Sequence, residues 1–221
     1  MKLSFSNQKS SAITFVEVLV VVACLLVLAL LILMFLPMDP ARRPRAARIE
    51  CVSNLKQINL AFRIWEGDNG NQYPMAVSVT NGGGREFIEK GDLAAFLQVA
   101  SNELGSTKIL VCPADPKRTF ATNWNDLDGS NISYFFGADV RNEDNTNLVL
   151  EGGDNLIVSG AAVKSGMLEL SSNAPVSWSG TRHKFCGNIG FADGTVVEGS
   201  SNGLEAAFQG TGLANNRIVI P

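Results

Sequence analysis

The chain has 221 residues, of which 46% are hydrophobic, and its formal net charge at pH 7 is −3. This length suits one compact domain with an appendage. From Glu50 to the C-terminus, 12 basic residues face 19 acidic ones. That balance argues against a nucleic-acid partner, because a nucleic-acid-binding surface needs a basic patch interleaved with aromatic side chains.

The first predicted element is a membrane helix. The stretch from Ile13 to Leu36 holds 24 residues, and its only charge is Glu17. A helix of this length reaches about 36 Å, enough to cross a bilayer core of about 30 Å. A cleaved secretory signal has a shorter apolar region, about 7–15 residues, followed by a small-residue cleavage site. Here Pro37 follows instead, so a retained single-pass helix is expected over residues 13–36.

A carboxylate near the centre of a membrane helix costs about 2.5–3.5 kcal/mol, and near an end, as at Glu17, it can reach the interface. An isolated acid there still needs a reason. It is either a tolerated residue that reaches the interface or the partner of a specific cation. The leader "MKLSFSNQKSSA" followed by "ITFVEVLVVV" resembles the class III signal of type IV prepilins and type II secretion pseudopilins. In that family a short basic leader ends in a small residue, usually Gly, and the mature chain carries Glu at its fifth position.

This resemblance implies a leader over residues 1–12, which prepilin peptidase removes by cutting between Ala12 and Ile13. Ala12 stands where Gly is usual, and Ile13 where Phe or Met is usual. Cleavage makes Ile13 an N-methylated terminus and Glu17 the fifth residue. The new amine and Glu17 are i and i+4 neighbours, and opposite charges attract strongly at low dielectric. Between subunits, the same pairing would set the depth and register of assembly.

Residues 37–67 predict an amphipathic continuation of the N-terminal helix. Three prolines would kink or interrupt it at the membrane surface: Pro37, Pro40 and Pro44. Apolar residues then recur every three or four positions and predict one core-facing stripe: Ile49, Val52, Leu55, Ile58, Phe62 and Trp65. Polar residues fall largely outside this stripe: Arg48, Asn54, Lys56, Asn59 and Arg63. The run Gly67–Gly70 ends the helix.

Residues 68–221 predict a loop-rich α+β head. "GDLAAFLQVA" indicates a short helix capped by Asp92, and "NGLEAAFQG" indicates another helix. Short β-type runs are "ISYFFG", "NLVLEGG", "NLIVSG" and "RIVI". "GNIGFADGTVVEG" places two alternating runs around Asp193-Gly194, which predicts a hairpin with a type I′ turn.

His183 precedes Asp193-Gly194 by nine residues, an H-x9-DG spacing over residues 183–194. This spacing resembles a C-terminal signature of prepilin-like proteins, and "CVSNLKQINLAFRIWEGDNGNQYP", "LVCPADPKR" and "ISYFFG" resemble the same group. The resemblance extends from Ala12 to about Val197. It implies a type IV pilin-like fold, in which a long N-terminal helix packs on an antiparallel sheet with long loops, and it implies no catalysis.

A catalytic interpretation of His183, Asp193 and Cys186 is less favourable. A cysteine nucleophile needs a base within about 3 Å. The predicted strand over residues 187–192 would span about 20 Å and would hold His183 and the hairpin tip at opposite ends. We therefore expect His183 to anchor the loop that enters the strand through hydrogen bonds, and Asp193 and Gly194 to form the turn.

A calcium loop is a candidate metal site, and no other cofactor is expected. The stretch "NDLDGSNIS" offers oxygen ligands at alternating positions: Asp126, Asp128, Asn131 and Ser133. The acidic residue that such a loop carries at its end is missing. Asp-Gly-Asn turns also occur without metal.

The four cysteines divide between the membrane helix and the head. Cys24 lies in the apolar run and is expected to pack as a small apolar residue. If the head is exported, two of Cys51, Cys112 and Cys186 can form a disulfide and one thiol remains. Cys51 with Cys112 is the first choice, because this pair would tie the loop "LVCPAD" to the helix; the other pairings stay open.

The orientation of the chain has conflicting signals. Arg42, Arg43, Arg45 and Arg48 form a basic collar suited to lipid headgroups. The positive-inside rule would place the head after this collar in the cytoplasm. The resemblance instead implies export, with a single pass through the inner membrane and the head in the periplasm.

The sequence thus indicates a non-catalytic filament subunit of a type II secretion or type IV pilus-like system. Its expected partners are copies of itself or other pilin-like subunits, prepilin peptidase, an inner-membrane assembly platform and membrane lipid. The alternative is a membrane-anchored binding or hydrolytic domain of the envelope that uses an ordinary signal anchor. Such a domain needs a pocket with converging polar groups.

Overall fold

The computed structural model describes residues 14–35 and 42–221 and has an α+β fold. The chain divides into two units, Met1–Ala41 and Arg42–Pro221. The predicted leader, residues 1–12, and the predicted cleavage site at Ala12 and Ile13 lie outside the described residues. So do Pro37 and Pro40.

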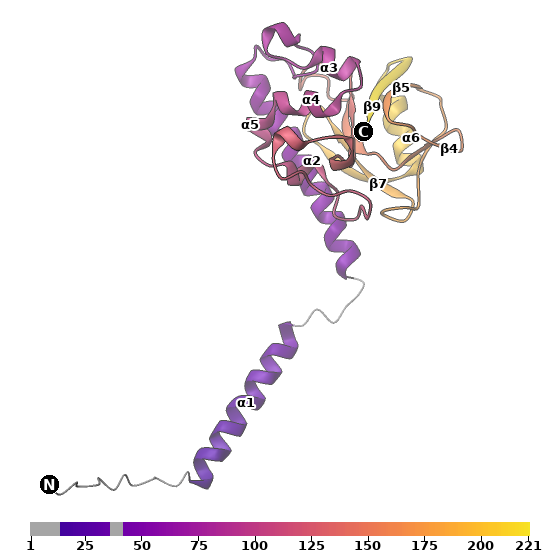
Figure 1. Cartoon of the computed structure of the whole chain (residues 1–221). Coiled ribbons are helices and arrows are strands. Elements are labelled where there is room, and N and C mark those ends of the chain that lie inside the picture. Colours follow the sequence, from indigo (N-terminus) through magenta and orange to yellow (C-terminus); the bar gives the residue numbers. More distant parts are fainter. Residues whose placement is uncertain (1–13, 36–41) are drawn as a thin grey trace, which may run out of the picture. The chain divides into compact units, whose positions relative to one another are not determined.

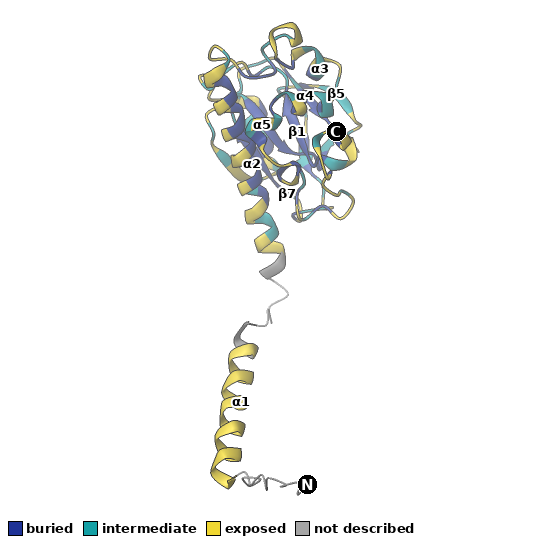
Figure 2. Cartoon of the chain, turned by 60° about the vertical axis from the view of Figure 1, so that its left-hand side comes forward, coloured by how far each residue is buried: buried dark blue, intermediate teal, exposed yellow. Residues whose placement is uncertain are grey.

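The first unit contains helix α1 (Phe15–Phe35), which lies within the predicted span 13–36. All side chains described in this helix are exposed, as the yellow ribbon in Figure 2 shows. An 18-residue window, Phe15–Ile32, has a mean hydropathy of 3.2. The helix is therefore long and apolar enough to cross a membrane, judged by its length and composition.

The second unit, which we call the head, contains two sheets and several helices (Figure 1). Its α-helices are α2 (Arg42–Asp68), α3 (Arg85–Glu89), α4 (Leu93–Val99), α5 (Ser101–Leu104) and α6 (Ser201–Gly210), and its 3₁₀ turns are η1 (Val79–Asn81), η2 (Thr107–Leu110), η3 (Trp124–Asp126) and η4 (Gly129–Asn131). Its strands are β1 (Tyr134–Gly137), β2 (Val149–Gly153), β3 (Leu156–Val158), β4 (Ala161–Ala162), β5 (Gly166–Ser171), β6 (Val176–Trp178), β7 (Cys186–Phe191), β8 (Val196–Ser200) and β9 (Asn215–Ile220).

Helix α2 carries the amphipathic pattern that the sequence predicts, with Pro44 in its first turn, where proline removes no helical hydrogen bond. The later stripe residues are buried: Leu55, Ile58, Phe62 and Trp65. The prediction is wrong for Ile49, which is 70% exposed. It is also wrong for Asn54 and Asn59, which are buried because polar partners reach them from elsewhere in the head.

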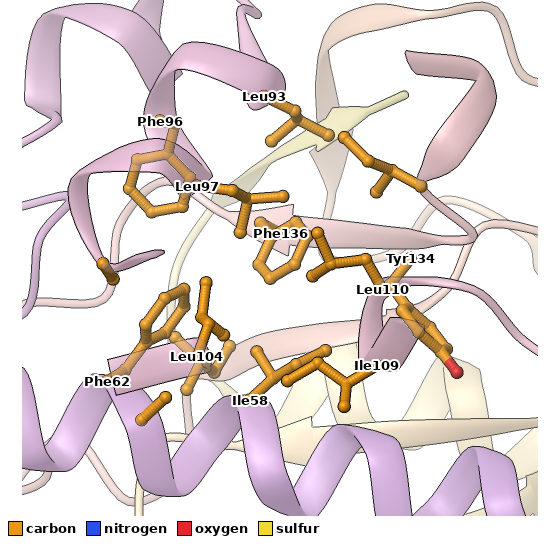
Figure 3. Close-up of a cluster of buried hydrophobic side chains, with 14 of the residues drawn as sticks. Ile58, Phe62, Leu93, Phe96, Leu97, Leu104, Ile109, Leu110, Tyr134 and Phe136 are labelled. Carbon is orange, nitrogen blue, oxygen red and sulfur yellow. The ribbon is translucent and has the colours of Figure 1, made fainter. Parts of the chain in front are cut away.

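The main core lies between α2, the short helices that follow it and one face of the larger sheet. Figure 3 shows Ile58 and Phe62 of α2 facing Leu97 of α4 and Phe136 of β1. The Phe62 ring centroid lies 5.8 Å from that of Phe96 and 6.0 Å from that of Phe136, distances typical of favourable aromatic pairs. Burying one such side chain stabilises the fold by about 1.5–3 kcal/mol.

The larger sheet is antiparallel, and its strands in the described chain follow the order β5-β9-β1-β2-β7-β8. Because side chains alternate along a strand, Tyr134 and Phe136 of β1 join the core beneath α2. Phe135 between them joins a second core with Phe208 of α6. The smaller sheet, β4-β3-β6, adds Trp178 to that second core.

The β7–β8 hairpin forms where it is predicted, but its turn is not type I′. Phe191 N donates to Thr195 O (2.8 Å) and Gly194 N donates to Phe191 O (3.0 Å). Of the three loop residues, Gly194 alone has a positive φ, 88°. This is a three-residue loop, a type I turn followed by a left-handed glycine. Ala192 is fully buried, and its carbonyl accepts a hydrogen bond from Tyr73 Oη (2.7 Å), which fixes the loop in this form.

Candidate functional site

Glu17 lies in the first turn of α1, and its described contacts are with Thr14. The Glu17 carboxylate accepts hydrogen bonds from Thr14 N (2.8 Å) and Thr14 Oγ1 (3.0 Å). Thr14 Oγ1 in turn accepts from Glu17 N (3.3 Å). This reciprocal pattern is a capping box. Its signature, T-x-x-E, is visible in the sequence but was not among the predicted features. Glu17 therefore helps to cap the start of α1, independently of any further role of its charge.

His183 lies against a disulfide that joins α2 to the loop after η2. Cys51 and Cys112 are bonded, with their Cα atoms 5.3 Å apart, and this is the pair that the sequence favours. His183 Nε2 lies 3.3 Å from Cys112 Sγ, and Arg48 Nη2 donates to His183 O (3.0 Å). Burial, and then the charges of Arg48 and Arg182, lower the pKa of His183. The imidazole is therefore neutral near pH 7.

In the described part of the chain, Cys51, Cys112 and His183 are the one group of three such ligand atoms close enough to hold a metal ion, within 4.8 Å of one another. Zinc binds cysteine as the thiolate. Both sulfurs are bonded to each other in this structure, so neither is a thiolate. The geometry here is that of a disulfide with a histidine packed on it.

A buried ionic network holds the chain just before His183. Arg182 Nη2 lies 2.7 Å from Asp115 Oδ2 and also contacts Asp154, which Arg118 contacts in turn. Arg182 Nη1 donates to Ser133 O (2.9 Å). Burial raises the pKa of Asp154, and the two arginines oppose that rise. The network fixes three loops to one another. Because two cations balance two anions, it carries no net charge.

The turn of the β7–β8 hairpin, at the opposite end of β7 from His183, docks near the C-terminal half of α2. Asn59 Nδ2 donates to Phe191 O (2.8 Å). Asp193 Oδ1 accepts from Thr195 N (2.8 Å) and so stabilises the turn itself. A Cβ atom at Gly194 would lie 3.3 Å from Arg63 Nη1 and would require a left-handed backbone. These contacts explain why a glycine suits this position.

The spacing of the H-x9-DG segment matches the helix beneath it. The six residues of β7 extend about 20 Å. The stretch of α2 from Arg48, which holds the His183 carbonyl, to Arg63, beside Gly194, rises about 22 Å. The strand thus runs alongside about four turns of α2 and is fastened at both ends. The structure does not bring His183 and Asp193 together, because β7 separates them.

Cys186 begins β7 as a half-buried free cysteine opposite Ser200 of β8.

The candidate calcium residues make local contacts. The Asp126 carboxylate accepts hydrogen bonds from Thr122 Oγ1 (3.2 Å) and from Asn123 Nδ2. Asp128 and Asn131 form a capping box around η4, while Ser133 Oγ donates to Asp115 (3.0 Å) and points into the ionic network. The alternating spacing therefore serves two separate turns and one buried contact, and calcium binding stays a prediction.

Glu151 in β2 is a buried acid that the sequence analysis did not single out. It is fully buried, Asn59 Nδ2 donates to its Oε1 (3.2 Å), and its Oε2 has no hydrogen-bond partner among the described residues. Gly190 faces it, and a Cβ there would lie 2.0 Å from Oε1. Burial raises the pKa of Glu151 well above its ordinary value. In the sequence, the one charged residue inside the predicted strand "NLVLEGG" was the signal that could have indicated this buried acid.

An open groove of about 360 Å³ at the β5–β9 side of the head is lined by charges of both signs: Asp139, Arg141, Glu169 and Arg217. Arg217 is engaged by Asp139 through Nε (2.8 Å), Nη2 (2.6 Å) and its backbone N (2.9 Å). A binding site for a small molecule is usually concave and mostly apolar, and this groove is neither enclosed nor apolar.

No protein-family model, curated protein or solved structure matches this chain. The functional assignment therefore rests on the residues described above and on the physical chemistry of their contacts.

Proposed function

We propose that this protein is a non-catalytic filament subunit, a pseudopilin or pilin of a type II secretion or type IV pilus-like system, and that α1 both anchors and assembles it. One observation carries the proposal: Glu17 is the single charge in the 24-residue apolar run Ile13–Leu36. The exposure of every described α1 side chain supports it, because such a surface requires lipid or other apolar helices around it.

Polar pairing is what gives an apolar helix a choice of partner. Lipid tails are as apolar as leucine, so packing and polar contacts, and not the hydrophobic effect, drive association between membrane helices. On α1 the polar group available for this is Glu17. The proposed cation is the α-amine that Ile13 gains when prepilin peptidase removes residues 1–12, either in the same chain or in a neighbouring subunit.

The capping box explains the position of Glu17 but not its charge. Glutamine serves at the third helical position of a capping box as glutamate does. A neutral glutamine in place of Glu17 would still accept a hydrogen bond from Thr14 N, and it would avoid placing an anion in an apolar segment. The charge is therefore the part of Glu17 that the proposed assembly step explains.

The head fits the same proposal. An antiparallel sheet packs on α2, which we propose to be the pilin-like arrangement. The H-x9-DG segment fastens that sheet to the helix, and the disulfide ties the loop after η2 to the same helix. A disulfide of this kind persists in oxidising compartments, which supports a head in the periplasm and a single pass through the inner membrane.

The charge of Glu17 is tested by Glu17→Gln, with Thr14→Ala as the matched control. Glu17→Gln keeps the capping box and removes the charge, while Thr14→Ala weakens the cap by about 0.5–2 kcal/mol and keeps the charge. We expect Glu17→Gln to insert normally and to enter filaments at least tenfold less, equivalent to about 1.4 kcal/mol. Thr14→Ala should enter at near wild-type levels. The readout is the amount of each variant in sheared filaments relative to the membrane pool; normal incorporation of Glu17→Gln contradicts the proposal.

A further inference from the structure

The H-x9-DG segment carries an exposed aromatic residue in an unusual backbone conformation. Lys184 and Phe185, directly after His183, have φ values of 55° and 62°. L-residues rarely adopt this left-handed region, and two in succession suggest a functional constraint. The Phe185 side chain is 66% exposed. Its ring lies over Gly180, where a Cβ would come within 2.8 Å of Phe185 Cζ.

Lys184 and Phe185 lie at the end of the head where α2 begins. Arg48, in the second turn of α2, donates from Nη2 to the carbonyl of His183 (3.0 Å) and pairs through Nη1 with Glu198 (2.5 Å). His183, the residue directly before Lys184, is therefore fixed to the first turns of α2. Neither Lys184 nor Phe185 contributes to either core of the head.

The first turns of α2 add basic and apolar side chains to the same end. Arg45 is exposed, and Ile49 is 70% exposed although its position in the apolar stripe predicts burial. In the sequence, four arginines and one glutamate occupy residues 42–50. Basic residues interspersed with a few exposed apolar ones are typical of a surface that lies on anionic lipid.

The connection between α1 and α2 is short. Six residues separate Phe35, the last residue of α1, from Arg42, the first of α2. A chain of that length spans at most about 25 Å even when fully extended. If α1 crosses a bilayer, as proposed above, this short connection limits how far Arg45 and Ile49, in the first turns of α2, can lie from the lipid.

We propose that this surface, formed by Arg45, Arg48, Ile49, Lys184 and Phe185, binds the anionic phospholipid surface of the bilayer in which α1 is anchored. Phe185 and Ile49 would enter the headgroup region, and Arg45 and Lys184 would contact phosphate, while Arg48 holds the segment in place through His183 O and Glu198. The inference rests on the proposed membrane anchor. It gives the first part of the H-x9-DG segment a second role, which is to hold the unassembled head on the membrane.

The experiment uses the full chain in nanodiscs that contain either phosphatidylcholine alone or phosphatidylcholine with phosphatidylglycerol. Hydrogen–deuterium exchange is followed in peptides covering residues 183–187. We expect exchange at Lys184–Cys186 to be several-fold slower in the anionic discs. This difference should vanish at an ionic strength of about 1 M, because the screening length there falls to about 3 Å. Equal exchange in the two lipids would overturn the proposal.

Two variants control for folding and for general charge effects. Lys184→Glu should abolish the lipid-dependent protection while the amides of the buried strand β1 exchange as in the wild type. Lys90→Glu makes the same charge change at the C-terminal end of α3, which lies away from the start of α2 (Figure 1), and should keep the protection. Equal loss in both variants would show that net charge matters and not this surface.

The remaining outcomes are also distinct. Protection that rises with the number of chains per disc, and not with lipid charge, would identify a second copy of the chain as the occupant and overturn the proposal. Incorporation into the discs is measured first. A chain that fails to incorporate contradicts the membrane anchor itself, whereas a chain that incorporates without lipid-dependent protection contradicts the surface contact alone.

Discussion

Helices α1 and α2 both carry many apolar residues, yet the chain uses them in opposite ways. Along α1 every described side chain is exposed, and along α2 one face is buried beneath the sheet. Figure 2 shows this difference as a uniformly yellow helix and a helix with a dark-blue face. Among the described residues, both cores of the head are formed by residues from Cys51 onward. The lesson is that α2 contributes to the core of the head, whereas the described surface of α1 is exposed, as the proposed function requires.

The same contrast applies to two carboxylates. Glu17 sits at the start of an exposed apolar helix, where Thr14 is its described partner. Glu151 is enclosed under α2, where Asn59 is its described partner. In the proposed assembly the charge of the first pairs with a cation, whereas burial favours the uncharged form of the second.

Shortening a core side chain of α2 should have the largest effect. Phe62→Ala should lower the free energy of unfolding of the head by about 3–5 kcal/mol, because it removes a large side chain and leaves a cavity. Urea unfolding of the full chain in detergent, followed by tryptophan fluorescence, measures this. Leu60→Ala, at a 56% exposed site on the same helix, should change the value by less than about 0.5 kcal/mol. Similar losses in both variants would contradict the assignment of the buried face.

Breaking the disulfide should rank second. Cys51 and Cys112 are 61 residues apart in the sequence, and removing such a link typically costs about 2–5 kcal/mol. Cys112→Ser should therefore destabilise the head by that amount in the same urea assay. The free-thiol variant Cys186→Ser is the control and should unfold almost as the wild type does. A wild-type midpoint for Cys112→Ser would mean that the disulfide does not support the fold.

Neutralising Glu151 should give a smaller, pH-dependent effect. Burial raises its folded-state pKa, so the folded head binds a proton more tightly than the unfolded chain. The stabilisation that this proton provides is complete below the unfolded pKa and is lost as pH rises toward the folded pKa. Glu151→Gln resembles the protonated acid, so at about pH 8 it should be more stable than the wild type by about 1–3 kcal/mol.

The stability difference between Glu151→Gln and the wild type should shrink toward about pH 4, near the unfolded pKa of glutamate, and urea midpoints across this range measure it. Glu66 and Tyr73, which also lie near this part of α2 and have raised pKa values caused first by burial, remain in both proteins and so cancel. A constant difference at every pH would show that Glu151 does not titrate between its folded and unfolded states.

Much of the fold follows from local signals. Asp92 caps α4 through Ala95 N as expected, and the runs chosen as strands correspond to β1, β2, β3, β7, β8 and β9. Strand β5 was missed because its formation depends on pairing with β9, about fifty residues away. Strand β6, which was also missed, forms by pairing with β3, about twenty residues earlier in the chain. Long-range pairing of this kind leaves no local pattern.

Polar burial was harder to predict than apolar burial. Asn54 and Asn59 resemble solvent-facing residues in a helical pattern, and they are buried because Val111 O and Glu151 accept their amide hydrogens across long sequence separations. Ala192 changed the hairpin turn for a similar reason, since Tyr73 holds its carbonyl. The capping box at Glu17, in contrast, was readable from T-x-x-E alone.

The central claim is that a terminal amine is created next to Glu17, and intact-mass and N-terminal peptide analysis of the membrane-extracted protein tests it most directly. We predict a mature chain that starts at Ile13 and carries an N-methyl group. A chain that still bears Met1–Ala12 would leave Glu17 without the proposed cation and would contradict the assembly mechanism.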